Sequence, residues 1–396
     1  MATNKDPKGW RWQTKAVRGG QKRSPFQETS EALYLTSGYA YEDPEQAEAR
    51  FKGAPGYVYT RYGNPTTSVF EDRMAMLEGA PVARATSSGM AAVSTALMCC
   101  LRSGDHVVAA KALFGAIRFV LEEVLPRWNI TVTLVDGTDI AQWRKAVTNK
   151  TKIVLLETPS NPTLEIVDIK KVADIAHKVG ARLMVDNAFA SPALQRPMEF
   201  GADIIVHSST KYIDGQGRVL GGVILCDEKF LSDHLQVYFR NVGPSLSPFN
   251  AWVHLKSLET LDLRIRQHSK NAAEVADFLA AEKKITRVIY PFRKDHPQHA
   301  LAKKQMSAGG GVMAFTIDGG KKEAFRFGRA LKLIDISNNL GDSKSLLTHP
   351  ATTTHQRMKA DARLEVGVTD SLVRLAVGLE DPADLCDDIA QALKKI

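Results

Sequence analysis

The central part of the chain alternates short apolar runs with longer segments of mixed polarity. The apolar runs are rich in β-branched residues: HVVAA (106–110), TVTLV (131–135), KIVLLE (152–157), RLMVD (182–186) and DIIVH (203–207). Apolar runs of this length are typical of strands that are buried on both faces of a parallel sheet. We therefore expect a set of parallel strands between about residues 85 and 225.

The segments between these runs have the spacing of amphipathic helices. SGMAAVSTALMCCLRSG (88–104) and DIKKVADIAHKVGA (168–181) each close on a glycine signal, which commonly ends a helix. Strands that alternate with helices predict a βαβ array with helices on both faces of the sheet. The predicted fold class is therefore α/β, with a mostly parallel central sheet.

The rhythm changes at GPSLSPFNAW (243–252), where we expect a domain boundary. A helical pattern follows over about 253–282, and strand-like runs then alternate with helical ones up to 395. A chain of 396 residues also exceeds what one hydrophobic core usually organises. The sequence predicts an N-terminal arm over 1–65, a large domain over 66–250 and a smaller C-terminal α+β domain over 251–396.

The net charge of +8 is concentrated at one end of the chain. Residues 1–23 hold seven basic residues against one acidic residue, Asp6, so the rest of the chain is nearly neutral. A short basic arm with Trp10 and Trp12 could contact an anionic partner, but a solvated or subunit-packing arm is the favoured interpretation. We therefore expect no nucleic-acid partner.

The composition also limits where the protein can be located and whether its cysteines can form disulfides or bind a metal. No apolar run approaches the roughly 20 residues that cross a bilayer, and the N-terminus lacks the apolar segment of a secretory signal. The four cysteines, at 99, 100, 226 and 386, form no CxxC motif. We expect a cytoplasmic protein with no membrane contact, reduced cysteines and no metal site.

Polar side chains follow several of the predicted strands. Ligands of α/β sheets bind beyond the carboxyl ends of the strands, so these residues are the candidates for a site. Gly89 and Met90 also start a helix, where backbone N–H groups lack intrahelical partners. The strand-end candidates are Asn161, Asp186, Ser208, Thr210 and Lys211.

This combination of groups suits pyridoxal phosphate. The cofactor's phosphate fits the helix start at Gly89 and Met90 together with hydroxyl donors such as Ser208 and Thr210. The aldehyde of the cofactor needs an amine that loses its proton near neutral pH, as a lysine can among apolar and cationic groups.

The cofactor's ring makes two further demands on the site. Its nitrogen stays protonated only beside a buried carboxylate, which Asp186 offers, and Asn161 can donate to the phenolate oxygen. Taken alone, each residue has a simpler explanation: Lys211 as a solvated lysine, Asp186 as a turn or cap residue. Their co-occurrence at successive strand ends favours the cofactor site.

These residues lie in motifs that resemble the Cys/Met-metabolism family of pyridoxal-phosphate enzymes. The most specific is DIIVHSSTKYIDGQG (203–217), and further motifs match in order: YTRYGNPT (59–66), SSGMAA (87–92), SNPTL (160–164), VDNAFASP (185–192), HPATTTH (349–355) and RLAVGLE (374–380). The resemblance covers nearly the whole chain. It implies the aspartate-aminotransferase-like fold, known as fold type I, and a homotetramer built as a dimer of dimers.

The resemblance also assigns roles to individual residues. Lys211 corresponds to the Schiff-base lysine, and Arg374 holds the α-carboxylate of the substrate, which Ser345 also contacts. Tyr59 and Arg61 bind the cofactor phosphate of a neighbouring subunit. An arginine in either role makes chemical sense, because its guanidinium binds carboxylate or phosphate through two hydrogen bonds.

Two positions depart from well-known family members. Phe114 stands where many carry a tyrosine stacked on the cofactor ring, so it can stack but cannot transfer a proton. Lys344 stands where members that form or cleave cystathionine have an acidic residue, and GQGRVLGG (215–222) supports the same interpretation, the sulfhydrylase branch.

The resemblance thus implies γ-replacement of the succinyl group of O-succinyl-L-homoserine by sulfide, giving homocysteine and succinate. Cystathionine γ-synthesis with cysteine and a γ-lyase reaction on cystathionine or methionine remain alternatives. The acetyl and phosphoryl esters also stay open. A non-catalytic, nucleic-acid-binding role would require the cofactor residues to be incidental.

Overall fold

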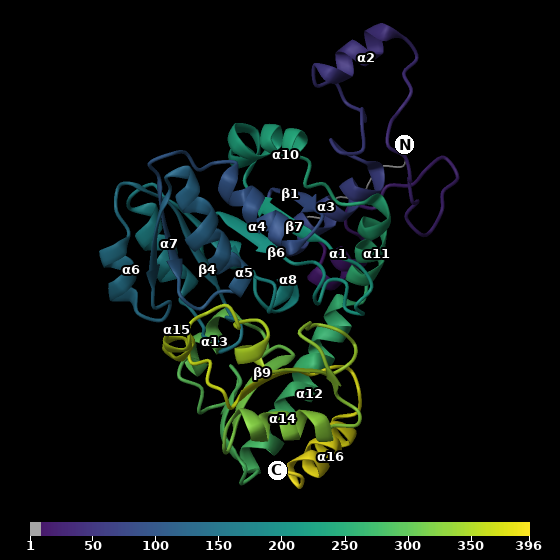
Figure 1. Ribbon diagram of the computed structural model, residues 1–396. Helices are drawn as coiled ribbons and strands as arrows, with labels where there is room; N and C mark the ends of the chain where they lie inside the picture. The colour runs from purple at the N-terminus through teal and green to yellow at the C-terminus, as the bar shows by residue number, and fades with distance from the viewer. Residues whose placement is uncertain (1–8) are drawn as a thin grey trace.

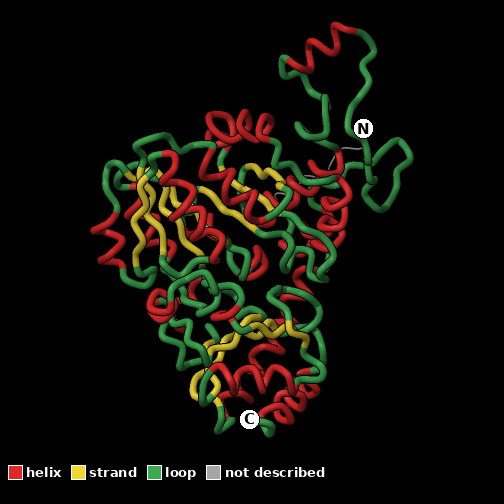
Figure 2. Tube along the Cα trace, viewed as in Figure 1, coloured by secondary structure: helices red, strands yellow, loops and turns green. Residues whose placement is uncertain are grey.

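The computed structural model describes residues 9–396 and contains two β-sheets (Figures 1 and 2). Lys5, Asp6 and Lys8 of the basic arm lie outside the described residues. The larger sheet has the order β1-β7-β6-β5-β4-β2-β3, and only β7 runs antiparallel to its neighbours. Its strands are β1 (Val82–Thr86), β2 (His106–Ala110), β3 (Thr131–Val135), β4 (Thr151–Glu157), β5 (Arg182–Asp186), β6 (Ile204–His207) and β7 (Gly222–Cys226).

Helices cover both faces of this sheet because alternate residues of each strand face opposite layers. Leu183 and Val185 of β5 pack in one core and Met184 packs in the other. The first core includes residues of α3 (Pro65–Glu78), α7 (Ile169–His177) and α11 (Pro248–Leu258). The second includes residues of α4 (Gly89–Met98), α5 (Gly115–Phe119) and α10 (Gln236–Val242).

The remaining helices of this half are short. They are α1 (Trp12–Arg18), α2 (Pro44–Phe51), α6 (Ile140–Ala146), α8 (Ser191–Leu194) and α9 (Glu228–Phe230), together with π-helical turns at Val120–Val124 and Leu231–Leu235 and 3-10 turns at Leu125–Trp128 and Pro197–Phe200.

The second sheet has the order β10-β11-β12-β9-β8. Its strands are β8 (Ile285–Ile289), β9 (Val312–Ile317), β10 (Asp335–Ile336), β11 (Leu346–Thr348) and β12 (Leu372–Ala376). One face packs against α12 (Leu261–Ala281), α14 (Lys321–Ala330) and α16 (Pro382–Leu393). The other elements of this half are α13 (His299–Gln305), a 3-10 turn at Pro350–Thr352 and α15 (Ala360–Glu365).

The pleat of β12 points one charged residue toward the large sheet. Val373 and Leu375 pack against the helices of the second sheet, whereas Leu372 and Ala376 join the core shared with the large sheet. Arg374 follows the parity of Leu372 and Ala376, so its side chain leaves an otherwise apolar face toward the large sheet. The second sheet thereby brings a cation to the edge where the ligand is expected.

The predicted strands at 106–110, 131–135 and 182–186 are confirmed at those bounds. The helical pattern predicted over about 253–282 is divided between two helices: α11 ends at Leu258, and α12 begins at Leu261. Arg264 stabilises the break. Its Nη2 donates to the carbonyl of Ser257 at 3.0 Å, and a continuous helix would use that carbonyl as a backbone hydrogen-bond acceptor.

The domain boundary predicted at residue 250 lies within α11, which packs on α3; it stays a prediction.

The segment around α2 projects away from the body of the molecule (Figure 1). Phe26, Leu35 and Phe51 on this arm are 91%, 66% and 68% exposed. Solvent exposure of large apolar side chains on a projecting segment is typical of a surface that packs on another subunit. Within the described part of the chain, no helix is long and apolar enough to cross a membrane.

Candidate active site

A cavity of about 230 Å³ is lined by residues at the strand ends of the large sheet and by Arg374 of β12. Nine of the residues predicted for the site line this cavity together: Gly89, Met90, Phe114, Asn161, Asp186, Ser208, Thr210, Lys211 and Arg374. They come from six separate segments of the chain, so only the fold brings them together. Their individual roles remain predictions that the geometry below supports.

Lys211 lies in the turn after β6 with its amine inside the cavity. Its Nζ donates to Oδ1 of Asn339 at 2.5 Å. Burial lowers the pKa of Lys211 to about 8, with a further lowering by Arg374 and an opposing effect of Asp186. With this pKa, about a tenth of the amine is unprotonated at pH 7, far more than for an ordinary lysine, and bond formation with an aldehyde requires that form.

A glycine allows the close contact between this turn and the second sheet. Gly341 has a φ of +78°, and a Cβ atom there would lie 2.6 Å from the backbone nitrogen of Tyr212 and 2.9 Å from the carbonyl carbon of Lys211. Because only glycine fits both the dihedral angle and the space, the segment that carries Asn339 can reach Lys211.

Asp186 ends β5 and is buried beside a second carboxylate, Glu157 at the end of β4. The two residues are direct partners in the parallel register of these strands, and the pleat turns both toward α4. Burial raises the pKa of Asp186 to about 6. A hydrogen bond from the Ala188 N–H at 3.0 Å and the charges of His207 and Lys211 act in the opposite direction and limit this rise. At neutral pH Asp186 is thus mostly ionised and can pair with a cationic ring nitrogen.

Glu157 is 2% exposed and holds two loops of the site in place. Its Oε2 accepts from the N–H of Phe114 at 2.8 Å and its Oε1 accepts from the N–H of Asn161 at 2.8 Å. Burial, and then the charge of Asp186, raises the pKa of Glu157 well above its ordinary value. Glu157 therefore fixes the stacking residue and the amide of the site relative to β4.

Arg374 lies at the opposite wall and is 1% exposed. Its Nη1 donates to Oδ1 of Asn161 at 3.0 Å, and its Nη2 donates to the carbonyls of Asn338 at 2.9 Å and Asn339 at 3.0 Å. Burial lowers the pKa of Arg374 to about 10, so it remains a cation. Its Nε is buried and has no hydrogen-bond partner within residues 9–396. Nη1 carries two N–H groups and makes one bond to those residues, so two donors remain for a ligand carboxylate.

The start of α4 forms the other end of the cavity. Ser88 caps this helix by accepting from the Ala91 N–H at 3.1 Å, and no described residue accepts from the N–H groups of Gly89 or Met90. A Cβ at Gly89 would lie 2.6 Å from Cβ of Ser208, so the absence of a side chain brings the helix start against the lysine turn. Thr210 Oγ1 donates to the carbonyl of Gly221 and accepts from its N–H.

These donors match the shape and charge of pyridoxal phosphate. Free N–H groups at a helix start suit a phosphate, Asp186 suits the ring nitrogen, and the amine of Lys211 suits the aldehyde. The unpaired Nε of Arg374 suits the carboxylate of an amino-acid substrate. The residues present therefore fit the cofactor predicted from the sequence.

Four other residues singled out in the sequence lie outside this cavity. The hydroxyl of Ser345 donates to Oε2 of Glu380 at 2.9 Å and accepts from the Gly378 N–H at 2.8 Å, so the geometry does not support a substrate contact. Lys344 is exposed and pairs with Asp342. Tyr59 and Arg61 line a separate surface hollow on the arm, so a role in their own chain's site is not supported either.

Two residues of the site were not predicted from the sequence. Glu157 was counted as the end of an apolar strand, although a carboxylate at the end of such a run, in register with Asp186, is a signal for a site. The sequence around Asn339 does not indicate a site, because asparagines are also typical of turns. Its contact with Lys211 depends on the packing of the two sheets.

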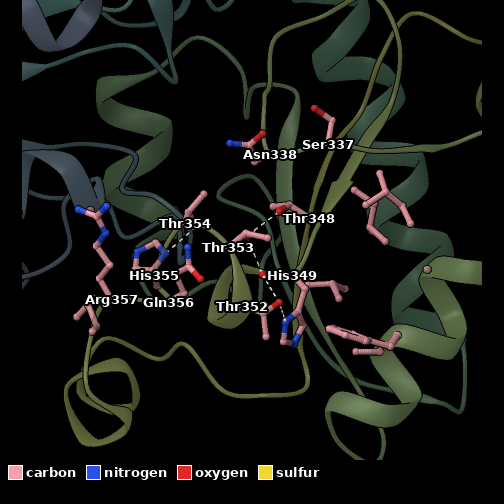
Figure 3. A pocket seen from close by; sticks show the side chains of 18 of the residues that line it. Ser337, Asn338, Thr348, His349, Thr352, Thr353, Thr354, His355, Gln356 and Arg357 are labelled. Atoms are coloured by element: carbon pink, nitrogen blue, oxygen red, sulfur yellow. Dashed lines mark hydrogen bonds between the residues drawn. The ribbon is translucent and has the colours of Figure 1, made fainter.

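The structure has a second, larger cavity of about 970 Å³, and Figure 3 shows side chains that line it. Phe114 and Asn338 line both cavities, so the two are neighbours. The segment Thr352–Met358 and one side of α14 form much of its wall. This cavity offers space for a substrate to extend beyond the cofactor site.

Solved structures share this architecture over almost the full chain. One is a putative O-acetylhomoserine (thiol)-lyase of Campylobacter jejuni that contains N'-pyridoxyl-lysine-5'-monophosphate, with a TM-score of 0.94 and 32% identity over 97% of this chain and 100% of that chain. Another is a cystathionine gamma-lyase of Lactobacillus plantarum in complex with L-serine, with a TM-score of 0.92 and 31% identity over 98% and 99% of the two chains. Fold and site together define a pyridoxal-phosphate-dependent enzyme of fold type I.

The family is shown by a match that runs from residue 13 to residue 394, to the model described as Cys/Met metabolism PLP-dependent enzyme. This chain belongs to that family. It is 50% identical to an O-succinylhomoserine sulfhydrylase of Mycobacterium tuberculosis over 98% of this chain and 97% of the relative. It is 46% identical to an O-succinylhomoserine sulfhydrylase of Pseudomonas aeruginosa over 98% and 96% of the two chains, and 39% identical to an L-methionine gamma-lyase of Porphyromonas gingivalis over 97% of each.

Proposed function

We propose that this enzyme is an O-succinylhomoserine sulfhydrylase, which replaces the succinyl group of O-succinyl-L-homoserine by sulfide to give homocysteine and succinate for methionine biosynthesis. The main support is the 50% identity to a sulfhydrylase of this specificity over nearly the whole of both chains. The γ-lyase relatives are more distant, at 39% identity or less.

Each of four residues of the cavity has its own role in such a reaction. Pyridoxal phosphate supplies an electron sink that stabilises negative charge next to the substrate's Cα. Arg374 binds the α-carboxylate through its free Nε, and Asp186 holds a proton on the ring nitrogen. Lys211, with its lowered pKa, removes the α-proton and transfers protons at Cβ. Phe114 lines the cavity where it would pack on the cofactor ring, and it has no hydroxyl with which to transfer a proton.

The surroundings of the site favour sulfide over cysteine as nucleophile. Cysteine brings an ammonium group that needs an acidic partner, and the larger cavity has no Asp or Glu in its lining within the described chain. Glu157 and Asp186 in the smaller cavity are already engaged. An unpaired ammonium in a cationic cavity is unfavourable, so the cavity lining disfavours cysteine. Lys344 lies outside both cavities and does not contribute to this preference.

We predict that the enzyme uses sulfide with a kcat/KM at least about ten-fold above that for cysteine when O-succinyl-L-homoserine is the partner substrate. Homocysteine and cystathionine are separated and quantified in the same assay, and O-acetyl- and O-phospho-L-homoserine are compared with the succinyl ester. A preference for cysteine would move the assignment to cystathionine γ-synthase. Production of 2-oxobutyrate from methionine or cystathionine at a comparable rate would favour a γ-lyase instead.

We further propose a cytoplasmic homotetramer built from dimers in which Tyr59 and Arg61 complete the site of the neighbouring chain. Three observations support this arrangement. The arm projects from the body, it carries exposed apolar side chains, and Tyr59 and Arg61 do not line the cofactor cavity of their own chain. A two-fold-symmetric interface is the common way to join such copies.

Mixed dimers test this arrangement. Lys211→Ala and Arg61→Ala should each be severely impaired alone, the first without its reactive amine and the second with a weakly held phosphate. Refolding them together should restore roughly a quarter of wild-type sites, since about half of the pairs are mixed and one site of each mixed pair is intact. A mixed species isolated with two different tags that stays inactive would place Arg61 in its own chain's site or outside the site.

A further inference from the structure

The larger cavity has an unusual charge pattern. Within the described chain its lining contains Arg329 and Arg357, together with several threonines, but no aspartate or glutamate. A cavity lined by cations without acidic partners attracts anions and strengthens their hydrogen bonds. Phe114 and Asn338 line both this cavity and the cofactor site, so the larger cavity lies where the part of a substrate that extends past the reacting carbon can reach.

Most other polar groups of this wall are already occupied. His349 bonds through Nδ1 to Oγ1 of Thr352 at 2.9 Å and through Nε2 to the carbonyl of Asp370 at 2.8 Å. Nδ1 of His355 bonds to Oγ1 of Thr354 at 2.8 Å, and burial lowers the pKa of His355 to about 4, so it is neutral. The bonds of His349 to Thr352 and of His355 to Thr354 are drawn in Figure 3.

Arg357, in contrast, has a free guanidinium group. No hydrogen bond or ion pair to its side chain is formed by residues 9–396, and it is exposed to the cavity and solvent. Arg329, at the end of α14 on the other wall, also forms no side-chain hydrogen bond or ion pair with residues 9–396 and is exposed. Two cations of equal charge thus face one cavity from different elements.

The contacts of the backbone favour Arg357 over Arg329 as the anion-binding residue. A Cβ at Gly115 would lie 2.7 Å from the carbonyl oxygen of Thr354, so the segment that carries Arg357 packs against the start of α5, next to Phe114. Arg329 instead follows Phe325 and Gly328 along α14, in the second sheet's helical layer. Arg357 is therefore attached to the wall that is shared with the cofactor site.

We propose that Arg357 binds the distal carboxylate of the substrate's succinyl group and so sets the preference for the succinyl over the acetyl ester. This inference rests on the proposed function. The succinyl ester ends in a carboxylate and the acetyl ester ends in a methyl group, so a guanidinium at this point stabilises only the first. A guanidinium can bind a carboxylate through two parallel hydrogen bonds, which a lysine cannot reproduce.

The test compares Arg357→Gln with Arg357→Lys and with Arg329→Gln as the matched control. For Arg357→Gln, kcat/KM for O-succinyl-L-homoserine with sulfide should fall about 10- to 100-fold, and that for O-acetyl-L-homoserine should stay within about two-fold. Arg357→Lys should recover part of the loss, and Arg329→Gln should leave the ratio of the two esters near the wild-type value. An equal loss with both esters, no loss, or the same change of ratio in Arg329→Gln would overturn the proposal.

Binding of the leaving group gives a second measurement. Succinate titrated into the holoenzyme by calorimetry should bind wild type more tightly than acetate does, and Arg357→Gln should lose at least about ten-fold in succinate affinity. Equal affinities of wild type and Arg357→Gln for succinate would contradict the assignment. Absence of turnover of the succinyl ester by wild type would instead overturn the proposed function itself, whereas normal turnover with an unchanged ester ratio in Arg357→Gln removes only the role of Arg357.

Discussion

Lys211→Ala will abolish turnover and remove the visible absorption that a lysine-linked pyridoxal phosphate gives to the enzyme. The loss of general acid-base catalysis alone costs about 10²- to 10⁴-fold in rate, and loss of the covalent attachment adds to it. The cofactor can still bind through the helix start at Gly89 and Met90, so absorption of the free aldehyde form should remain. The measurements are the spectrum of the purified variant and its steady-state rate.

A matched control separates this effect from the loss of any lysine. Lys170→Ala removes an exposed lysine of α7 that pairs with Asp174, and both its spectrum and its rate should match wild type. Borohydride treatment of wild type should fix the cofactor on the peptide that contains Lys211 and on no other lysine. Retention of the visible band in Lys211→Ala, or labelling of a different peptide, would disprove the assignment.

The large sheet could be predicted because its signal is local. The apolar runs of β2 and β5 are almost fully buried, so each position in them favours an apolar residue. β3 lies at the edge of the sheet with Thr131 and Thr133 exposed, and its local signal is the alternation of polar and apolar residues. The break between α11 and α12 could not be predicted in this way, because it depends on Arg264, which reaches back to the Ser257 carbonyl once the chain has folded. Periodicity alone favours one continuous helix there.

The cofactor site was predictable where its residues follow strands. Asp186 and Lys211 lie at fixed offsets from the ends of β5 and β6, and parallel strands carry their carboxyl ends to the same edge. Asn339 is different, since it reaches Lys211 only because Gly341 allows two sheets to approach. Arg374 was assigned by resemblance, and the pleat of β12 supplies the physical reason for its direction.

The arm and the substrate end of the site were the least predictable from sequence. Ser345 was expected to contact substrate, yet its hydroxyl is taken by Glu380 and Gly378. Arg357 gave no signal, because an isolated arginine in a polar segment is most often a surface residue. Its free guanidinium is informative only once the cavity around it is known.

Asp186→Asn should lower kcat by about 10²-fold or more while the fold stays intact. The carboxamide has nearly the same shape and can still accept from the Ala188 N–H, but it is neutral and cannot hold a proton on the ring nitrogen. The spectrum of the bound cofactor should shift with the loss of that proton, which a purely structural role would not cause. Asp174→Asn, on the exposed face of α7, is the matched control and should behave as wild type.

The neighbouring Glu157 should not rescue this variant, although it is a carboxylate beside the same position. Its Oε1 and Oε2 already accept from the N–H groups of Asn161 and Phe114, and burial with Asp186 nearby raises its pKa. Turning it toward the ring would leave two buried N–H groups unpaired, at a cost of about 1–3 kcal/mol each. If Asp186→Asn nevertheless stays within a few-fold of wild type and the double variant with Glu157→Gln does not, then Glu157 rather than Asp186 is the partner of the ring nitrogen.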